Sequence, residues 1–156
     1  VEHLCLIVLL TGCRLAEAWG LESTDINEER LAFKIQHNST RRIKNQISTR
    51  ELPLTTSINK AIKKYFASSK PSSAASASAA LGKFYKSNKF EFGSHSLRHF
   101  MRDTLDQLGA RASEINGICG WSSGSMRDHY GNRDLTELLR LRLQAVENHI
   151  SESLTA

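Results

Sequence analysis

The sequence lacks any long apolar run and any sign of membrane targeting. No stretch approaches the roughly 20 consecutive apolar residues that a transmembrane helix requires, and no charged segment followed by an apolar run and a small-residue cleavage site marks a signal peptide. We therefore expect no membrane partner. A chain of 156 residues is long enough to bury a core of its own, so we predict one domain over residues 1–156.

Cysteines are few, and none forms a C-x-x-C pair. Cys5, Cys13 and Cys119 are an odd number, and each lies in an apolar helical context. This pattern does not suit a disulfide framework and favours reduced, buried thiols. We therefore expect a cytoplasmic protein.

The chain carries a net charge of +5, and this charge is concentrated in one segment. Residues 34–70 hold nine Lys or Arg against one acidic residue, whereas residues 2–33 hold two against six. A basic surface displaces counterions from nucleic-acid phosphates, which favours DNA as a partner. The same charges could equally lie on a solvated hairpin and helix face, so charge alone leaves both interpretations open.

The apolar periodicity predicts an α+β fold that is mainly helical, with one small three-stranded antiparallel sheet. Alternating patterns predict strands at 25–27, 31–36 and 50–54. No internal repeat is present. Helical patterns cover residues 2–10, 14–20, 58–66, 95–108, 113–119, 123–129 and 134–150.

The Ser/Ala-rich segment 72–80 has the composition of a flexible linker. Alanine is the best helix former, however, and Leu81, Phe84 and Tyr85 follow at helical spacing. We therefore predict a helix capped by Ser73 or Ser76. By the same reasoning Thr55 or Thr56 caps the helix before it, and Ser94 caps the helix after it.

Four short segments carry side chains suited to chemistry on a phosphate. A guanidinium offers paired donors that match phosphate oxygens, an ammonium can give a proton to a leaving oxygen, and an imidazole titrates near neutral pH. A phenol can act as a nucleophile. The segments are T-G-C-R-L-A-E with Arg14, the polar stretch 37–49 with Lys44, H-S-L-R-H with His95 and Arg98, and G-W-S-S with Trp121, followed nine residues later by Tyr130.

In this order the segments resemble the catalytic domain of the tyrosine recombinases, also called phage integrases, from about Leu6 to Tyr130. That family has a T-G-x-R-x-x-E block, a Lys in a hairpin before a Pro-Leu pair, an H-x-L-R-H box, and a Gly-(His or Trp)-Ser-Ser segment before its tyrosine nucleophile. Trp121 stands where His is commoner in the family. An indole can donate one hydrogen bond but cannot exchange a proton, so His95 must carry more of any proton transfer.

The resemblance implies that Tyr130 attacks a DNA phosphate, forms a 3′-phosphotyrosyl link and frees a 5′-hydroxyl without any cofactor. It implies that Arg14 and Arg98 hold the non-bridging phosphate oxygens. Lys44 would protonate the leaving 5′-oxygen, and His95 would act as general acid or base.

Further residues are expected to support this chemistry. Glu17 would orient a catalytic cation or its own helix, although a solvated helix face is the alternative. His99 lies one turn beyond His95, and this H-x-x-x-H pair lacks a third ligand for zinc, so we predict no metal site. DNA contacts are expected from the basic segment, at Arg41, Arg42 and Arg50.

The resemblance also implies partners: double-stranded DNA, sister subunits in a homotetramer on paired sites, and accessory DNA-bending factors. A bacterial or phage-encoded, nucleoid-associated protein is expected. The apolar surface of 134–150 is expected to dock on a neighbouring subunit. Because the chain begins at Val1 inside an apolar helix, we expect a fragment from which an N-terminal DNA-binding domain is absent.

Two other functions remain open. Residues 112–130 also fit a helix-turn-helix, with Ile115 and Ile118 before the Gly120 turn, as in a DNA-binding regulator without chemistry. That function leaves Arg14 and the H-S-L-R-H box unexplained. A type IB-like topoisomerase would share the tyrosine chemistry, and would be distinguished by a relaxed rather than a recombined DNA product.

Overall fold

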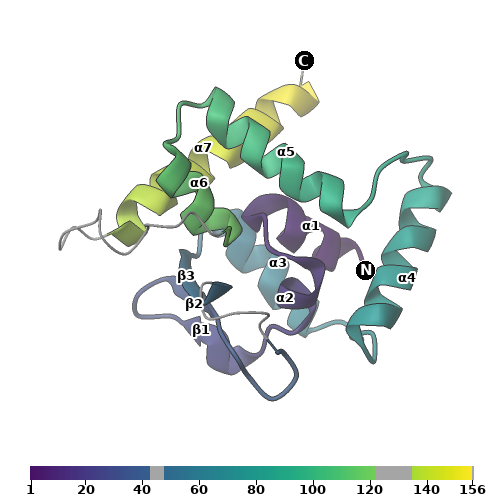
Figure 1. The fold of residues 1–156 in the computed structure, drawn as a ribbon. Helices are drawn as coiled ribbons and strands as arrows, with labels where there is room; N and C mark the ends of the chain where they lie inside the picture. Colours follow the sequence, from purple (N-terminus) through teal and green to yellow (C-terminus); the bar gives the residue numbers. More distant parts are fainter. Residues whose placement is uncertain (43–47, 122–134, 156) are drawn as a thin grey trace.

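The computed structural model describes residues 1–42, 48–121 and 135–155, which form a helical domain with a small sheet at one end (Figure 1). This confirms the predicted α+β, mainly helical fold. Within the described ranges no helix combines the length and the apolar character needed to cross a bilayer. The elements are α1 (Glu2–Thr11), α2 (Leu15–Trp19), the 3-10 turn η1 (Ser23–Asp25), β1 (Ile26–Asn27), β2 (Ala32–Ile35), β3 (Arg50–Pro53), α3 (Thr56–Phe66), α4 (Ala74–Ser87), α5 (Ser94–Gln107), α6 (Ala112–Cys119) and α7 (Leu135–Thr155).

Helix α1 lies at the centre of the domain, where it contacts α2, α3, α4, α5 and α7. It is apolar on most sides, and Leu4, Ile7 and Val8 are fully buried, because an all-round apolar helix is stable only when other elements surround it. The helix ends at Gly12, whose φ of 62° carries no Cβ penalty in glycine. This turn places Arg14 at the N-cap of α2.

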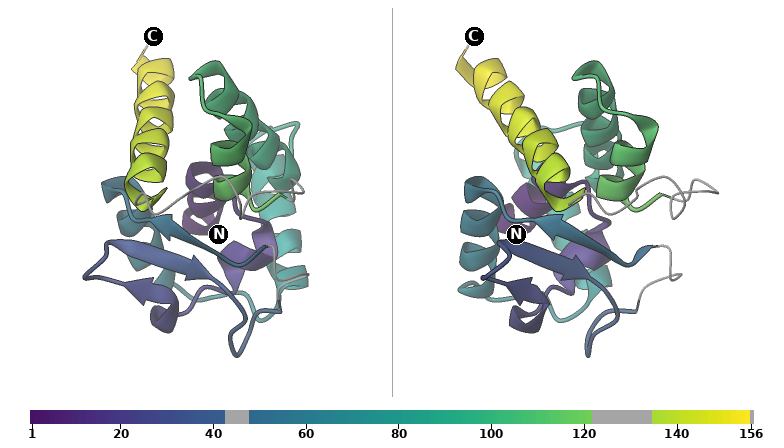
Figure 2. Two further views of the ribbon diagram at one scale, coloured as in Figure 1. Left: turned by 60° about the vertical axis from the view of Figure 1, so that its left-hand side comes forward. Right: turned by 90° about the vertical axis from the view of Figure 1, so that its left-hand side faces the viewer.

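The sheet has the order β1-β2-β3, and both neighbouring pairs are antiparallel. Phe33 on β2 pairs with Leu52 on β3, and Ile35 pairs with Arg50. Phe33, Ile35 and Leu52 are fully buried. Helix α7 stands over the sheet and contacts β3 (Figure 2), so the first and last thirds of the chain share one core.

The predicted caps of α3 and α4 are confirmed. Thr55 is the N-cap of α3, and its hydroxyl accepts a hydrogen bond from the Ile58 N–H at 3.3 Å. Ser73 is the N-cap of α4 and accepts from the Ser76 N–H at 3.0 Å. The Ser/Ala-rich segment is therefore a capped helix rather than a linker.

The N-cap predicted for α5 is wrong by one residue. Gly93 occupies that position, and Ser94 is the first residue of the helix. The Ser94 hydroxyl lies 3.3 Å from the phenolic oxygen of Tyr85 on α4. The Ser94 side chain, which was expected to cap α5, thus contacts Tyr85 on α4 instead.

Helix α7 packs on its own domain, contrary to the expectation that it docks on a neighbour. Leu139, Leu143 and Val146 are buried in the core. Arg142 Nε lies 2.7 Å from a carboxylate oxygen of the buried Glu114 on α6. The wide apolar surface of α7 is therefore largely buried against other elements of the same chain.

Candidate active site

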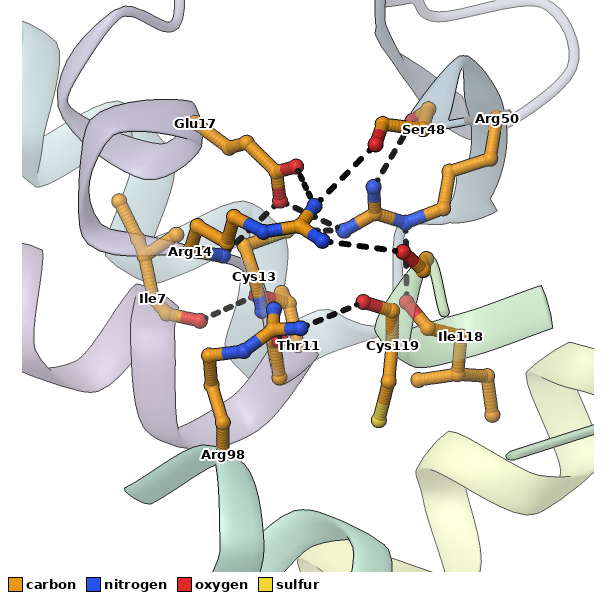
Figure 3. Close-up of polar contacts among 12 residues, drawn as sticks. Ile7, Thr11, Cys13, Arg14, Glu17, Ser48, Arg50, Arg98, Ile118 and Cys119 are labelled. Carbon is orange, nitrogen blue, oxygen red and sulfur yellow. Dashed lines mark hydrogen bonds and ion pairs between the residues drawn. The ribbon is translucent and has the colours of Figure 1, made fainter. Parts of the chain in front are cut away.

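Arg14, at the start of α2, contacts Glu17 of its own helix and two other parts of the chain (Figure 3). Its Nη1 donates to Glu17 Oε1 at 2.7 Å and to Ser48 Oγ at 3.3 Å. Its Nη2 donates to the Gly120 carbonyl at 3.3 Å. The side chain is nevertheless 38% exposed, so the guanidinium is both oriented and accessible.

Arg98, in the second turn of α5, is only 4% exposed. Its Nη1 donates to the Gly12 carbonyl, and its Nη2 donates to the Cys119 carbonyl at 2.9 Å. Burial, and to a smaller degree the nearby charge of Arg14, lowers the pKa of Arg98 from its usual value, whereas Glu17 opposes this shift. An arginine remains protonated in proteins, and with five N–H groups it keeps further donors for a second partner.

The Trp121 ring lies close to Arg98 and to two histidines of α5. The Arg98 and Arg102 guanidinium carbons each lie 5.8 Å from the centroid of the Trp121 ring. The His99 ring is 6.5 Å from the same indole, and His95 packs edge-on against His99 at 4.6 Å. The structure therefore gathers Arg14, Arg98, Trp121, His95 and His99 from three separate segments.

Glu17 is a buried partner of two arginines, which rules out the alternative of a solvated helix face. It is 5% exposed, and its Oε2 lies 2.9 Å from Arg50 Nη2 while Oε1 contacts Arg14. Burial alone would raise the pKa of Glu17, but the charge and hydrogen bond of Arg50 and the hydrogen bonds of Arg14 lower it below the usual value. Glu17 thus contacts Arg14 directly, and its role in orienting a catalytic cation stays a prediction.

Arg41 lies in the interior rather than at a surface that DNA could reach. It is 2% exposed and forms an ion pair with the buried Asp25 at 3.0 Å. Its Nη1 also donates to the Glu17 carbonyl at 3.0 Å. We therefore revise the expectation that Arg41 contacts DNA. The neighbouring Arg42 is exposed and stays a predicted DNA contact.

Arg50 is also buried, with a side chain that is 7% exposed. Its Nε donates to the Ile118 carbonyl and its Nη1 to the Ser48 carbonyl, both at 2.9 Å. These donors are thus occupied by the protein, so we revise the predicted DNA contact here as well. The strand pattern indicates the burial of Arg50, because Arg50 and Leu52 are two residues apart and therefore share one face of β3.

Lys44 and Tyr130 lie outside the described residues, so their roles stay predictions. Of the described residues in the same two segments, Ser48 contacts Arg14 and Trp121 lies near Arg98.

The gathered groups define a class of site. Two guanidiniums and an indole whose N–H has no partner among the described residues face one region, beside two imidazoles. Such a set binds a phosphate and stabilises negative charge that develops on it. In the described part of the chain no group of three His, Cys, Asp or Glu side chains could hold a metal ion. The two guanidiniums and the indole are thus suited to a phosphate ligand.

The sequence model of the phage integrase family matches residues 2–137. Because this match covers most of the 156 residues, the chain belongs to the phage integrase family. The predicted family is thus confirmed. No curated protein matches this chain.

Solved structures of the integrase of the transposon Tn1549 share the fold. The complex with circular intermediate DNA is 17% identical, with a TM-score of 0.63 over 89% of this chain and 58% of that chain. A variant in a second complex with circular intermediate DNA gives 17% identity and a TM-score of 0.66, over 91% and 57%. A variant in complex with transposon right end DNA gives 17% and 0.64, over 99% and 58%. This chain thus spans less than two thirds of the length of those chains.

Proposed function

We propose that this chain is the catalytic domain of a site-specific tyrosine recombinase, an integrase of a mobile element that cleaves and rejoins double-stranded DNA. One observation carries the proposal: Arg14 and Arg98 come from separate helices, yet both bind carbonyls that immediately precede Trp121. Membership in the phage integrase family supports it. The shared fold with an integrase solved in complex with DNA also supports it.

The chemistry follows from these groups. The phenolic oxygen of Tyr130 attacks the phosphorus, and the bond from phosphorus to the 5′-oxygen breaks. His95 accepts the phenol proton, while Lys44 gives a proton to the leaving 5′-oxygen. Arg14 and Arg98 stabilise the charge that builds on the non-bridging oxygens. The 3′-phosphotyrosyl ester keeps the bond energy, so rejoining is the reverse of the same steps and no cofactor is required.

DNA would contact exposed basic side chains. Arg42, two residues before Lys44, is exposed, and on the outer face of α3 so are Lys60, Lys63 and Lys64. Each phosphate neutralised by such a side chain releases condensed counterions, so affinity should fall linearly with the logarithm of salt concentration. By family membership we further propose a homotetramer on paired sites, accessory DNA-bending factors, and a location at the bacterial nucleoid.

A helix-turn-helix regulator is a poorer fit to the structure. The C-terminal end of α6, which would lead into the turn, supplies the Ile118, Cys119 and Gly120 carbonyls to Arg50, Arg98 and Arg14. A recognition module has no need for three buried or half-buried arginines at that turn.

The test is trapping of the covalent intermediate. A duplex carrying the recombination site of the encoding element, nicked close to the cleavage position, releases a short fragment and prevents religation. Wild-type chain should give a protein–DNA adduct on a denaturing gel, with the nucleotide mapped by mass spectrometry to Tyr130. Tyr130→Phe should bind the same duplex and give no adduct. An adduct that persists in Tyr130→Phe would overturn the assignment, and relaxed but unrecombined plasmid would indicate a topoisomerase.

A further inference from the structure

We infer that Arg50 is a positioning residue that sets the placement of Arg14 and Trp121 relative to each other. The inference rests on the proposed function of this site. Arg50 lies at the first position of β3, six residues after Lys44. Its side chain is only 7% exposed, so it would act through its neighbours.

Three bonds of equal length join Arg50 to three segments of the site. Its guanidinium reaches Glu17 of α2, the Ser48 carbonyl at the end of the hairpin, and the Ile118 carbonyl of α6, each at 2.9 Å (Figure 3). The Arg14 guanidinium contacts the same three segments, at Glu17, the Ser48 hydroxyl and the Gly120 carbonyl, but unlike Arg50 it is partly exposed. A shift of Arg50 would therefore move all three segments.

Arg50 also packs against the backbone that leads into Trp121. A Cβ placed on Gly120 would lie 2.7 Å from the Arg50 guanidinium carbon, so only glycine leaves room for the guanidinium. The carbonyl of this same glycine accepts the Arg14 hydrogen bond. The Arg50 guanidinium therefore fixes the position of Gly120, whose carbonyl accepts the hydrogen bond from Arg14.

The charge of Arg50 matters as well as its shape. Glu17 divides its two carboxylate oxygens between Arg14 and Arg50. Without Arg50 the whole negative charge of Glu17 would face Arg14 and weaken its attraction for a phosphate. A lysine would keep the charge, but its three N–H donors share one nitrogen, so they cannot span three acceptors that Arg50 reaches through three separate nitrogens.

The test compares Arg50→Lys and Arg50→Ala in a Trp19→Phe background, where Trp121 is the remaining tryptophan of the two in the chain. Arg142→Lys is the matched control, because Arg142 likewise joins a buried glutamate to two backbone carbonyls. Three quantities are measured: Trp121 emission and its quenching by acrylamide without DNA, affinity for the nicked duplex, and the single-turnover rate of adduct formation.

We expect both Arg50 variants to shift Trp121 emission and to lower the adduct rate by about 100-fold, since a small misplacement of reacting groups can cost that much. The dissociation constant for DNA should stay within about threefold, because Arg50 makes no DNA contact. Guanidinium ion at millimolar concentration should restore part of the rate of Arg50→Ala by refilling the site. Arg142→Lys should lose stability with no change in Trp121 emission.

The proposal is overturned if folded Arg50→Lys keeps both the wild-type emission and the wild-type adduct rate. Should Arg50→Ala not fold, Arg50→Lys alone decides, because it retains the charge and most of the side-chain volume. If the wild-type chain forms no adduct, the proposed recombinase function is wrong. The Trp121 emission and quenching measurements need no DNA, so they still show whether Arg50 positions Trp121.

Discussion

Arg14 Nη2 lies 3.3 Å from the carbonyl oxygen of Gly120, and this hydrogen bond ties the start of α2 to the turn after α6. The two preceding carbonyls, of Ile118 and Cys119, accept from Arg50 and Arg98. The last carbonyls of a helix have no partner within it and carry partial negative charge. The end of α6 is therefore a common anchor for three guanidiniums.

Gly120→Ala should disturb this anchor. The φ of 66° is strained for alanine, and the new Cβ would meet the Arg50 guanidinium. We expect a loss of about 1–3 kcal/mol in the free energy of unfolding, measured by urea titration. Gly82→Ala on α4 is the control, since no atom lies within 4 Å of its new Cβ. Equal stability of the two variants would contradict the packing described.

Arg98→Lys should separate catalysis from binding. One lost donor to a transition-state oxyanion typically costs about 10²–10³-fold in rate, and we expect that fall in adduct formation with little change in DNA affinity. The Gly12 or Cys119 carbonyl would also lose its partner, which costs about 1–3 kcal/mol of stability. Cleavage at the wild-type rate by this variant would contradict the proposal that Arg98 holds the phosphate oxygens.

Glu17→Gln should change the response to acid. The pKa of Glu17 is lowered below its usual 4.5 in the folded chain, so its ionisation stabilises the fold fully above that value. This contribution is lost as the pH falls through the folded-state pKa. Urea midpoints measured from about pH 6 downward should therefore fall more steeply for wild type than for Glu17→Gln. Parallel curves would show that the carboxylate makes no such contribution.

The thiols should differ in reactivity. Burial raises the pKa of Cys119 to about 11, and burial also raises the pKa of the fully enclosed Cys13. Because the thiolate is the reactive form, iodoacetamide near neutral pH should modify the half-buried Cys5 first. Peptide mass spectrometry would follow the three sites, and urea should bring Cys13 and Cys119 up to the rate of Cys5. Fast labelling of Cys119 in the native chain would argue against its burial.

Leu143→Ala tests the packing of α7 within its own chain. Leu143 is fully buried, and removing such a side chain costs about 2–5 kcal/mol. Because the contact lies within one chain, the loss should not depend on protein concentration. Leu141→Ala, at a position that is 60% exposed, should change stability by about 0.5 kcal/mol or less. A concentration-dependent effect at Leu143 would instead indicate docking on a second subunit.

Local features were predictable from the sequence because short-range physics decides them. The apolar stripe of α3 and the Thr55 cap appear in the fold as expected, and so does the helix formed by the Ser/Ala-rich segment. The strands were also placed to within one or two residues. In each case the deciding contacts lie within one helical turn or one strand pair.

Long-range partners were not predictable from local pattern. Arg41 and Arg50 belong to a basic segment. The strand pattern places Arg50 on the buried face of β3, but no local pattern identifies Asp25 and Glu17 as the partners of these two arginines. The apolar face of α7 was correctly predicted to be buried, but it was expected to dock on a neighbouring subunit and instead packs on its own domain. Apolar periodicity shows that a helix face is buried and does not identify the surface that covers it. The convergence of Arg14 and Arg98 likewise depends on carbonyls that carry no side-chain signature.

The dependence of Arg14 and Arg98 on the end of α6 has a consequence during protein synthesis. Both arginines leave the ribosome long before the carbonyls of Cys119 and Gly120 that orient them. A nascent polypeptide, or one that terminates before α6, therefore contains Arg14 and Arg98 but lacks the carbonyls that orient their guanidinium groups.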